Sequence, residues 1–206
     1  MIPDITRQSS AARPSLRLSP HRPPFEFYPT PPEATRAFLA AEAFDGSVWE
    51  PACGLGAISM ELEAAGYETV STDLADYGYG AAGCDFLKCR TPKAKHIVTN
   101  PPYGAGLADR FVRQALNLTA QTGGKVAMLL NLNSLCHPGR HESFMRRPPA
   151  RLYGLDNCVC YPNGDPALAT RRTREHRYVW AVWTPEPVPQ TTFHWLTTAP
   201  YRKEGA

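Results

Sequence analysis

The sequence predicts an α/β protein built on one sheet with helices on both of its faces. The main reason is that strand-like and helix-like segments alternate through the middle of the chain. The length of 206 residues fits one domain with a good-sized core and leaves little for a second. The apolar fraction of 43% is ordinary for a soluble globular protein, so a conventional packed core is expected.

The first half of the chain alternates short strands with a helix. Strands are predicted at 47–50 and 69–72, and a glycine turn and a helix over about 57–65 lie between them. A weaker third strand is predicted to end near Asp85, and a fourth covers 96–99.

The second half begins with a helix over 107–120, in which Phe111, Val112, Ala115 and Leu116 share one face. A buried strand follows at 125–130. The last predicted strand, at 178–183, is rich in β-branched and aromatic residues.

Three segments show no regular period. Residues 1–25 are rich in proline and arginine and are expected to be a disordered basic tail before a domain over 26–184. Residues 185–206 are also proline-rich and are expected to be a C-terminal tail on the surface. The stretch 131–177 is irregular and arginine-rich, and because long irregular segments are usually functional loops, we expect it to face the substrate.

The net charge of +3 is small, but the arginines are unevenly distributed. Between Arg140 and Arg177 there are eight arginines and four acids. Arginine suits bidentate phosphate contacts, so a nucleic-acid-facing surface is predicted here, and a solvated basic face is the plainer alternative. The candidate nucleic-acid-binding residues are Arg140, Arg146, Arg147, Arg171, Arg172 and Arg174.

Cysteine spacing and hydropathy argue against several other classes of protein. The six cysteines form no CxxC pair, and Cys158 with Cys160 is a poor metal spacing, so we expect reduced thiols and no metal site. No segment approaches the roughly 18 apolar residues of a membrane span, and the N-terminus lacks the apolar core of a secretory signal. A cytoplasmic protein without a membrane partner is expected.

A small-residue turn, EPACGLGA at 50–57, lies between the first strand and the first helix. Such a turn lets a ligand approach the backbone and offers free N–H groups at the start of the helix. Asp73 closes the second strand, where an acid suits the paired hydroxyls of a ribose. Turn and acid together indicate a nucleoside-containing cofactor without saying which one. The structural alternatives are Asp73 as a helix cap and Cys53 as a small buried hydrophobe.

The tetrapeptide Asn100-Pro101-Pro102-Tyr103 comes directly after the fourth strand. An amide, two rigid prolines and an aromatic ring suit the binding of a flat, hydrogen-bonding group such as a nucleobase. Asn-Pro and Pro-Pro pairs also mark ordinary turns, so the tetrapeptide alone is only suggestive.

Several motifs in the right order make the chain resemble the S-adenosylmethionine-dependent amino-methyltransferases. The similarity is greatest to the adenine-N6 DNA methyltransferases whose cofactor motifs precede the catalytic one, and it covers about residues 27–132. It implies a single Rossmann-like class I methyltransferase domain with a mostly parallel seven-stranded sheet and an antiparallel last strand. The motifs are Thr30-Pro31-Pro32, Glu50-Pro51-Ala52-Cys53-Gly54, Asp73, Asp85-Phe86 and Asn100-Pro101-Pro102-Tyr103.

The resemblance also implies roles for the matched residues around S-adenosylmethionine. Thr30 would contact the methionine carboxylate, and Asp73, with Leu74 beside it, would hold the ribose hydroxyls. Asp85 would accept a hydrogen bond from the cofactor adenine, while Phe86 packs on its ring, a role compatible with a core position. The methionine and ribose region would be lined by Glu50, Ala52, Cys53 and Gly54, with Asn100 also close to the cofactor.

A mechanism for the tetrapeptide follows from the chemistry of the adenine amino nitrogen, whose lone pair is delocalised into the ring. Two acceptors, the Asn100 side-chain oxygen and the Pro101 carbonyl, would bind its two N–H groups and direct the lone pair at the methyl group. The prolines restrict the backbone, so the acceptors are preorganised. Tyr103 would stack on a base taken from a duplex or a single strand. No metal or covalent intermediate is required.

The same geometry serves enzymes that methylate amino groups of adenine or guanine in ribosomal RNA, or glutamine amides in release factors. The Thr30-Pro31-Pro32 motif and the arginines favour DNA, and RNA stays open. Larger DNA methyltransferases of this type have a separate target-recognition domain, whereas about 23 residues follow Trp183. If DNA is the substrate, residues 140–177 would have to recognise the target sequence, or the enzyme would have low sequence specificity. A catalytically inactive binding module is a further alternative, against which the complete tetrapeptide argues.

Overall fold

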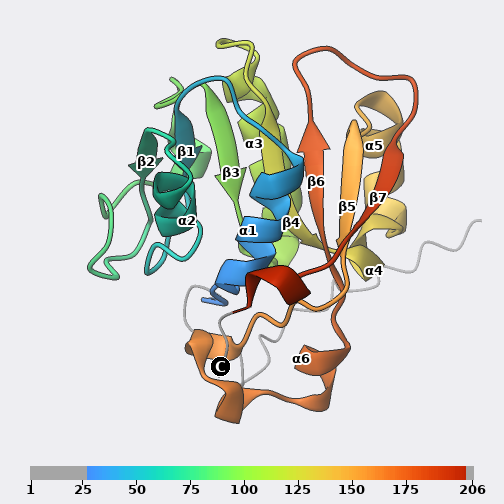
Figure 1. Cartoon of the computed structure of the whole chain (residues 1–206). Helices are drawn as coiled ribbons and strands as arrows, with labels where there is room; N and C mark the ends of the chain where they lie inside the picture. Colours follow the sequence, from blue (N-terminus) through green and yellow to red (C-terminus); the bar gives the residue numbers. More distant parts are fainter. Residues whose placement is uncertain (1–26, 203–206) are drawn as a thin grey trace, which may run out of the picture.

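A seven-stranded sheet runs through the centre of the protein, with helices on both faces (Figure 1). The computed structural model describes residues 27–202. The strands are β1 (Val48–Glu50), β2 (Thr69–Ser71), β3 (His96–Thr99), β4 (Val126–Asn131), β5 (Arg151–Leu155), β6 (Tyr178–Trp183) and β7 (Thr192–Leu196). The α-helices in this part of the chain are α1 (Pro32–Ala41), α2 (Ser59–Ala64), α3 (Leu107–Thr119), α4 (Leu132–Leu135), α5 (Pro138–Arg146) and α6 (Arg171–Glu175).

The strand order is β2-β1-β3-β4-β6-β5-β7. β6 runs antiparallel to both of its neighbours, and the remaining neighbouring pairs are parallel. The predicted α/β class is therefore confirmed, and the strand predicted at 178–183 is the antiparallel one. Because β1, β2, β3 and β4 are parallel, their carboxyl ends meet at one edge of the sheet, which lies toward the bottom of Figure 1.

Helices α1 and α2 cover one face of the sheet (Figure 1). Phe38 of α1 stacks on Trp180 of β6 with ring centroids 4.5 Å apart, and both side chains are fully buried. The Trp180 indole N–H donates to the Ala34 carbonyl at 3.1 Å, so the helix is fixed by apolar contact and by a hydrogen bond. No element is predicted here from the sequence. Pro32 occupies the first helical turn, where its missing N–H costs nothing, and is a start signal for α1.

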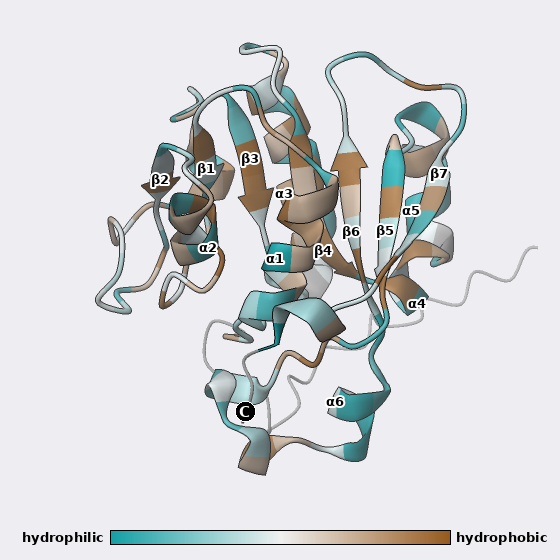
Figure 2. Cartoon of the chain, viewed as in Figure 1, coloured by the Kyte–Doolittle hydropathy of each residue, from teal (hydrophilic) through white to brown (hydrophobic). Residues whose placement is uncertain are grey.

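Helices α3 and α5 lie against the other face. In α3 the apolar side chains Phe111, Ala115 and Leu118 are buried, whereas Asn117 is exposed, as the 3.6-residue period predicts. The helix predicted over 107–120 is confirmed. Figure 2 shows that the central strands between the two helical layers are hydrophobic and that α6 is hydrophilic.

Two expectations about elements are wrong. No strand ends at Asp85, because the segment after β2 makes one bridge, between Thr72 and Ala81, and then enters the short 3-10 helix η2 (Phe86–Lys88). Three glycines in this segment have positive φ, which breaks an extended run. The seventh strand is β7 instead, which lies within the segment expected to be a C-terminal tail. Its β-prone aromatic residues pair parallel to β5.

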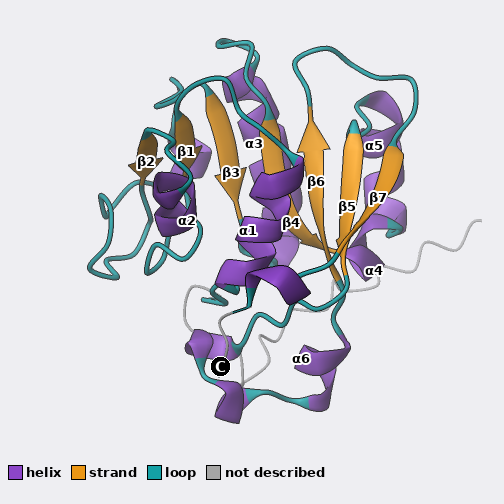
Figure 3. Cartoon of the chain, in the orientation of Figure 1, coloured by secondary structure: helices purple, strands orange, loops and turns teal. Residues whose placement is uncertain are grey.

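The segment 131–177 is more regular than expected, because it contains α4, α5 and β5. Its second part, 156–177, has only short helical pieces and lies beyond the carboxyl ends of the parallel strands (Figures 1 and 3). The tail predicted at 1–25 lies outside the described residues. Between residues 27 and 202, none of the helices combines the length and apolar character that a membrane crossing needs.

Candidate active site

An open cleft lies where the loops that follow β1, β2 and β3 meet. All thirteen residues predicted for catalysis or cofactor binding line this cleft, although they come from five separate parts of the sequence. The motifs that follow β1, β2 and β3 meet because the carboxyl ends of these parallel strands share an edge of the sheet, and loops bring Thr30, Asp85 and Phe86 to the same place. The predicted residues in the wall are Thr30, Glu50, Ala52, Cys53, Gly54, Asp73, Leu74, Asp85, Phe86, Asn100, Pro101, Pro102 and Tyr103.

The glycine turn after β1 is hydrogen-bonded to Asp73. The Gly54 N–H donates to Asp73 Oδ2 at 2.8 Å, and Oδ1 of the same carboxylate accepts from the Ala75 N–H at 2.9 Å. Gly54 has a φ of 53°, and a Cβ at this position would lie 2.5 Å from the Phe27 ring. Glycine is therefore required by the backbone conformation and by the approach of Phe27. Each Asp73 oxygen keeps a second acceptor position, so the carboxylate can also accept from a ligand.

Glu50 ends β1, and its carboxyl group is buried in the wall of the cleft. Its Oε2 accepts from the backbone N–H of Ser59 at 2.7 Å and from the Ser59 hydroxyl. Burial raises the pKa of Glu50 to about 8, because it opposes the charged form more than the Ser59 hydrogen bonds favour it. The negative charge of Asp73 raises this pKa further. Glu50 is therefore mostly protonated at neutral pH and will ionise when a cation is placed beside it.

Cys53 is a small buried side chain in the same wall. Its thiol donates to the Tyr79 carbonyl at 3.5 Å, and burial raises its pKa to about 12. A thiol that stays protonated is a weak nucleophile, so Cys53 contributes shape and packing rather than reactivity.

Asp85 and Phe86 lie at the start of η2. Asp85 Oδ1 accepts from the Leu87 N–H at 3.1 Å, and Oδ2 lies 3.1 Å from Lys88 Nζ. Phe86 is buried and packs edge-on to Trp49, with ring centroids 5.2 Å apart. Phe86 is thus a core residue that also lines the cleft, so its core position is compatible with the predicted contact to a ligand.

Asn100, the first residue after β3, is oriented from both sides of its amide group. Nδ2 donates to the Tyr28 carbonyl at 2.9 Å and to Thr30 Oγ1 at 3.2 Å. Oδ1 lies 2.9 Å from the Tyr103 hydroxyl, which also lies 2.7 Å from the Leu129 carbonyl. The amide plane is therefore fixed, and Oδ1 keeps an acceptor position for an incoming N–H group.

Tyr103 is anchored through its hydroxyl, while its ring is half-buried in the cleft wall. Burial raises the pKa of Tyr103 well above its usual value, so the hydroxyl remains a hydrogen-bond donor at all moderate pH values. The ring meets Tyr178 edge-on, with centroids 6.3 Å apart. The anchored hydroxyl fixes the axis of the ring, and the contact with Tyr178 restricts rotation of the ring plane, which is a requirement for the predicted stacking on a base.

Solved structures with this architecture include several methyltransferases. A protein from Listeria monocytogenes described as a class I S-adenosylmethionine-dependent methyltransferase superimposes with a TM-score of 0.58, over 82% of this chain at 13% identity. Two modification or methyltransferase subunits of type I restriction systems, from Vibrio vulnificus and Streptococcus thermophilus, both give a TM-score of 0.54 over 87% of this chain, at 15% and 12% identity. The chain has the class I methyltransferase fold.

These likenesses are structural, at low sequence identity. No protein-family model matches the chain, and no curated protein matches it by sequence. This methyltransferase-fold chain spans 65% of the length of the Listeria protein and 48% and 49% of the two restriction-system subunits. Its cleft therefore has to be interpreted from its own residues.

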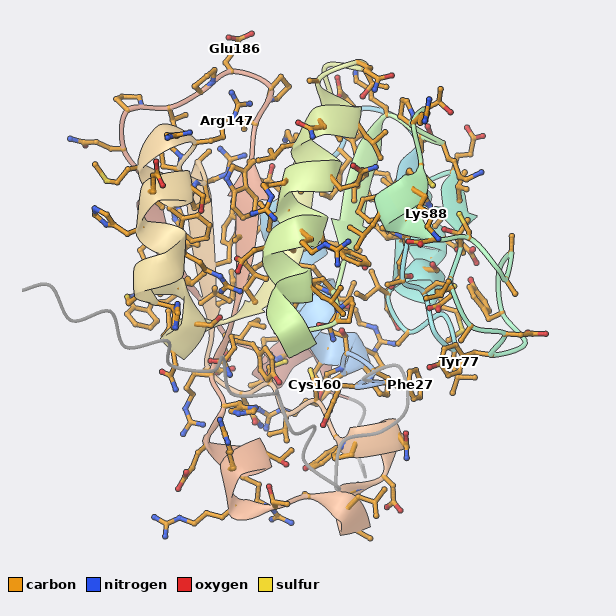
Figure 4. All side chains as sticks on the ribbon, turned by 180° about the vertical axis from the view of Figure 1, so that it is seen from behind. Phe27, Tyr77, Lys88, Arg147, Cys160 and Glu186 are labelled. Carbon is orange, nitrogen blue, oxygen red and sulfur yellow. The ribbon has the colours of Figure 1, made fainter. Side chains whose placement is uncertain are left out.

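The six predicted nucleic-acid-binding arginines do not lie on one surface of the methyltransferase fold. Arg140 is buried, where it pairs with Asp109 and ties α5 to α3. Arg147 donates to two backbone carbonyls just after β6, at 2.9 and 2.7 Å. Figure 4 places Arg147 at the end of the molecule opposite Phe27 and Tyr77. The expectation that these two arginines face the substrate is therefore not supported by their positions.

The other four predicted arginines are exposed. Arg146 pairs with a glutamate on its own helix, α5, next to Arg147. Arg171 pairs with Glu175 at 2.7 Å, and Arg172 and Arg174 are exposed on the same helix, α6. Because α6 belongs to the 156–177 segment, these three arginines lie beyond the same sheet edge as the cleft (Figure 1).

The 156–177 segment also contacts the segment that orients Asn100. The Asn163 N–H donates to the Phe27 carbonyl at 3.0 Å. The next residue, Gly164, has a φ of 75°, and a Cβ there would lie 3.2 Å from Pro29. The arginine-bearing segment therefore supports residues 27–30, which in turn hold the Asn100 amide.

Sequence reasoning missed part of the cleft wall. Phe27 and Tyr77 stack with ring centroids 4.7 Å apart and planes at 24°, and Figure 4 shows them side by side. Aromatic residues beside proline at 25–29 and alternating with glycine at 77–80 were the available signals. In residues 27–202, no three His, Cys, Asp or Glu side chains gather as a metal site. The other unpredicted wall residues are Tyr28, Pro29, Pro51, Ala57, Ile58, Cys84, Leu87, Leu107 and Phe111.

Proposed function

We propose that the protein transfers a methyl group from S-adenosylmethionine to the exocyclic N6 amino group of adenine in DNA. The observation that carries this proposal is the fixed orientation of Asn100 at the end of β3, in the same cleft as Glu50, Asp73 and Phe86. A methyl-transfer site needs a cofactor pocket and an acceptor pair at one place. These residues supply both kinds of group.

The side chains in the cleft fit the chemical groups of S-adenosylmethionine, which supplies an electrophilic methyl group. The buried carboxyl of Glu50 can ionise beside a methionine ammonium group. Asp73 can accept hydrogen bonds from ribose hydroxyls, and Thr30 can donate to a carboxylate because its oxygen already accepts from Asn100. The adenine ring would be held between Leu74, which is 55% exposed, and Phe86.

Asn100 and Pro101 act on the substrate amino group. Asn100 Oδ1 and the Pro101 carbonyl would accept its two N–H groups and so favour a nitrogen whose lone pair is no longer shared with the ring. The hydrogen bonds to Tyr28 and Thr30 hold the amide so that its oxygen faces Tyr103, which means that this orientation is present before the substrate binds. Preorganisation of this kind lowers the cost of reaching the reactive geometry.

The choice of DNA is supported by the basic surface near the cleft and by the structural neighbours. Arg171, Arg172 and Arg174 on α6 provide phosphate-binding groups at the same sheet edge. Two of the similar structures are subunits of type I restriction systems. Phosphate contacts position a nucleic acid without reading its sequence, so we expect modest sequence specificity from α6 alone.

The test is transfer of a labelled methyl group to separate samples of duplex DNA, single-stranded DNA, ribosomal RNA and protein. Digestion and mass analysis then identify the methylated base or residue, which we expect to be N6-methyladenine from DNA. The variant Asn100→Ala should lose transfer while keeping cofactor binding. Asn117→Ala, on the exposed face of α3, is the matched control and should keep both.

Each of the other possible results of this experiment would support a different function. Label on an RNA amino group would place the substrate in RNA, and label on a glutamine amide would place it in a protein. Cofactor binding without transfer to any sample would indicate an inactive binding module. Full activity of Asn100→Ala would contradict the mechanism.

A further inference from the structure

Two half-buried cysteines bracket the η2 helix at the side of the cleft. The sulfur atoms of Cys84 and Cys89 lie 3.8 Å apart, in contact with each other. Between them are Asp85 and Phe86, the residues assigned to the cofactor adenine, and Cys84 itself lines the cleft. The mechanism proposed above uses neither thiol.

The surroundings of this pair favour reaction with an anionic reagent. Arg90 and Lys93 follow Cys89 along the chain and are both exposed. Lys88, labelled in Figure 4, lies just before Cys89 and pairs with Asp85 at 3.1 Å, so the uncompensated positive charge comes from Arg90 and Lys93. Positive charge and partial exposure are the conditions under which cysteines react with small disulfides. Tripeptide disulfides such as oxidised glutathione are anions, so the basic loop attracts them.

The two thiols have different parts in such a reaction. Cys84 lines the open cleft, so it is the sulfur that a reagent in the cleft reaches first. Cys89 is in contact with Cys84 Sγ and is in position to complete the exchange, although burial raises its own pKa to about 11.

We propose that Cys84 and Cys89 are a modification site, at which small-molecule disulfides convert the two thiols to an intramolecular disulfide. Cys84 loses its proton and attacks one sulfur of oxidised glutathione as the thiolate, which forms a mixed disulfide and releases one glutathione thiolate that takes up this proton. Cys89 then loses its proton and attacks Cys84 Sγ, which breaks the mixed disulfide and releases the second glutathione thiolate, and this thiolate takes up the proton from Cys89. The two cysteines are oxidised by two electrons, and one glutathione disulfide is reduced to two glutathione thiols.

Disulfide formation would change the cleft. The sulfurs must approach from 3.8 Å to about 2 Å, so the side chains or the loop have to move. Both cysteines are tied to neighbouring segments through their backbones, because Gln114 of α3 donates to the Cys89 carbonyl at 2.6 Å and the Cys84 N–H donates to the Asp73 carbonyl at 2.9 Å. A shift at Cys84 would therefore be transmitted to Asp73 and to the cleft wall. The oxidised form would bind the adenine part of a ligand more weakly, and this last consequence rests on the proposed function.

The chain contains its own control pair. Cys158 and Cys160 have sulfurs 4.0 Å apart, a similar separation, but only 6% and 1% of these residues is exposed. A disulfide reagent in solution cannot reach them in the folded protein. Reactivity set by distance alone would oxidise both pairs, whereas reactivity set by access and charge oxidises only Cys84 and Cys89.

The experiment uses the full chain carrying Cys136→Ser, because Cys136 is an exposed thiol that would take up glutathione independently. The reduced protein is treated with oxidised glutathione, and the product is analysed by intact mass and peptide mapping. We expect the loss of two hydrogens and a peptide that links Cys84 to Cys89. Cys89→Ser should instead hold one glutathione on Cys84. A linkage at Cys158–Cys160, or no modification at 84 and 89, overturns the proposal.

A second arm separates this inference from the proposed function. S-adenosylhomocysteine, which presents the same adenine and ribose, should slow the oxidation and bind the oxidised protein more weakly than the reduced protein. A disulfide that forms at the same rate with and without this ligand would support the thiol pair and contradict the adenine site. Ligand binding without any oxidation would support the adenine site and overturn the thiol pair.

Discussion

Replacing Glu50 by glutamine is expected to abolish a proton release that accompanies cofactor binding. The Glu50 carboxyl lines the cleft, and burial raises its pKa to about 8. A cationic group placed against a carboxyl stabilises its charged form and lowers its pKa. If the methionine ammonium of S-adenosylmethionine binds at Glu50, the carboxyl loses its proton when the ligand binds.

The size of the effect follows from the pKa. At pH 7, a group with a pKa of about 8 is protonated in about nine molecules of ten, so binding releases up to about 0.9 proton per site. The release falls to about 0.5 proton at pH 8 and about 0.1 proton at pH 9. Titration calorimetry in buffers with different ionisation enthalpies measures this number directly. Glu50→Gln should release none, while Glu68→Gln, at an exposed glutamate, should behave as the parent protein.

The same pKa predicts how the stability of the ligand-free protein depends on pH. Glu50 has a higher pKa in the folded chain than its ordinary 4.5, so its contribution to stability is complete below about pH 4.5 and is lost as the pH rises toward 8. Relative to Glu50→Gln, the parent should lose about 1.4 kcal/mol of unfolding free energy per pH unit across this interval. Equal slopes for the two proteins, or proton release that persists in Glu50→Gln, would refute the reasoning.

Four further substitutions test the hydrogen bonds around the site and the core. Tyr103→Phe removes the hydroxyl that meets Asn100 Oδ1, and transfer should slow by about ten-fold, the effect of one lost hydrogen bond, with cofactor affinity unchanged in a binding titration. Thr30→Val should reduce the rate of transfer, because the Asn100 amide loses a hydrogen-bond partner. Thr35→Val is the control, because the Thr35 hydroxyl is buried without a partner among the described residues. It should leave the rate of transfer unaltered and should leave the stability unaltered or increase it. Burial lowers the pKa of His96, whose Nδ1 accepts a backbone N–H at 2.8 Å. The neutral imidazole therefore stabilises the folded protein fully above about pH 6.5, and this contribution is lost as the pH falls. The unfolding free energy of His96→Asn, measured by denaturant titration, should lack this acid dependence.

The fold could be predicted from the sequence wherever burial has a regular period. The strand at 178–183 and the helix at 107–120 are confirmed because both have strong apolar patterns. β7 was not predicted, because its residues are mostly exposed and it is stabilised by backbone pairing to β5 rather than by a buried face. α1 was missed because its prolines were assigned to a motif, although Pro32 also starts a helix.

Much of the cleft wall could be predicted because the motifs at Glu50, Asp73 and Asn100 follow β1, β2 and β3, and the carboxyl ends of parallel strands converge. The motifs at Thr30 and Asp85 follow no strand and reach the cleft through loops. Arginine function could not be predicted in the same way. Arg140 is neutralised by Asp109, a partner on a helix 31 residues earlier in the chain, and local composition carries no information about such pairing. The choice between a structural and a ligand-binding arginine depends on tertiary contacts, so a count of charges in a segment does not decide it.

The segment that carries α6 is connected to the Asn100 amide through residues 27–30 and their hydrogen bonds. Asn163, in the segment that carries α6, donates to the Phe27 carbonyl, and the next residues, Tyr28 and Thr30, accept from Asn100. On the proposed function, a nucleic acid that contacts α6 would therefore bear on the segment that orients the Asn100 amide. A cofactor that contacts Thr30 bears on the same amide from the other side. Each ligand would restrict the movement of groups that the other needs, and binding that orders shared groups favours the second ligand. On this arrangement, affinity for cofactor and affinity for substrate rise together, and loss of the Thr30 hydroxyl weakens that coupling.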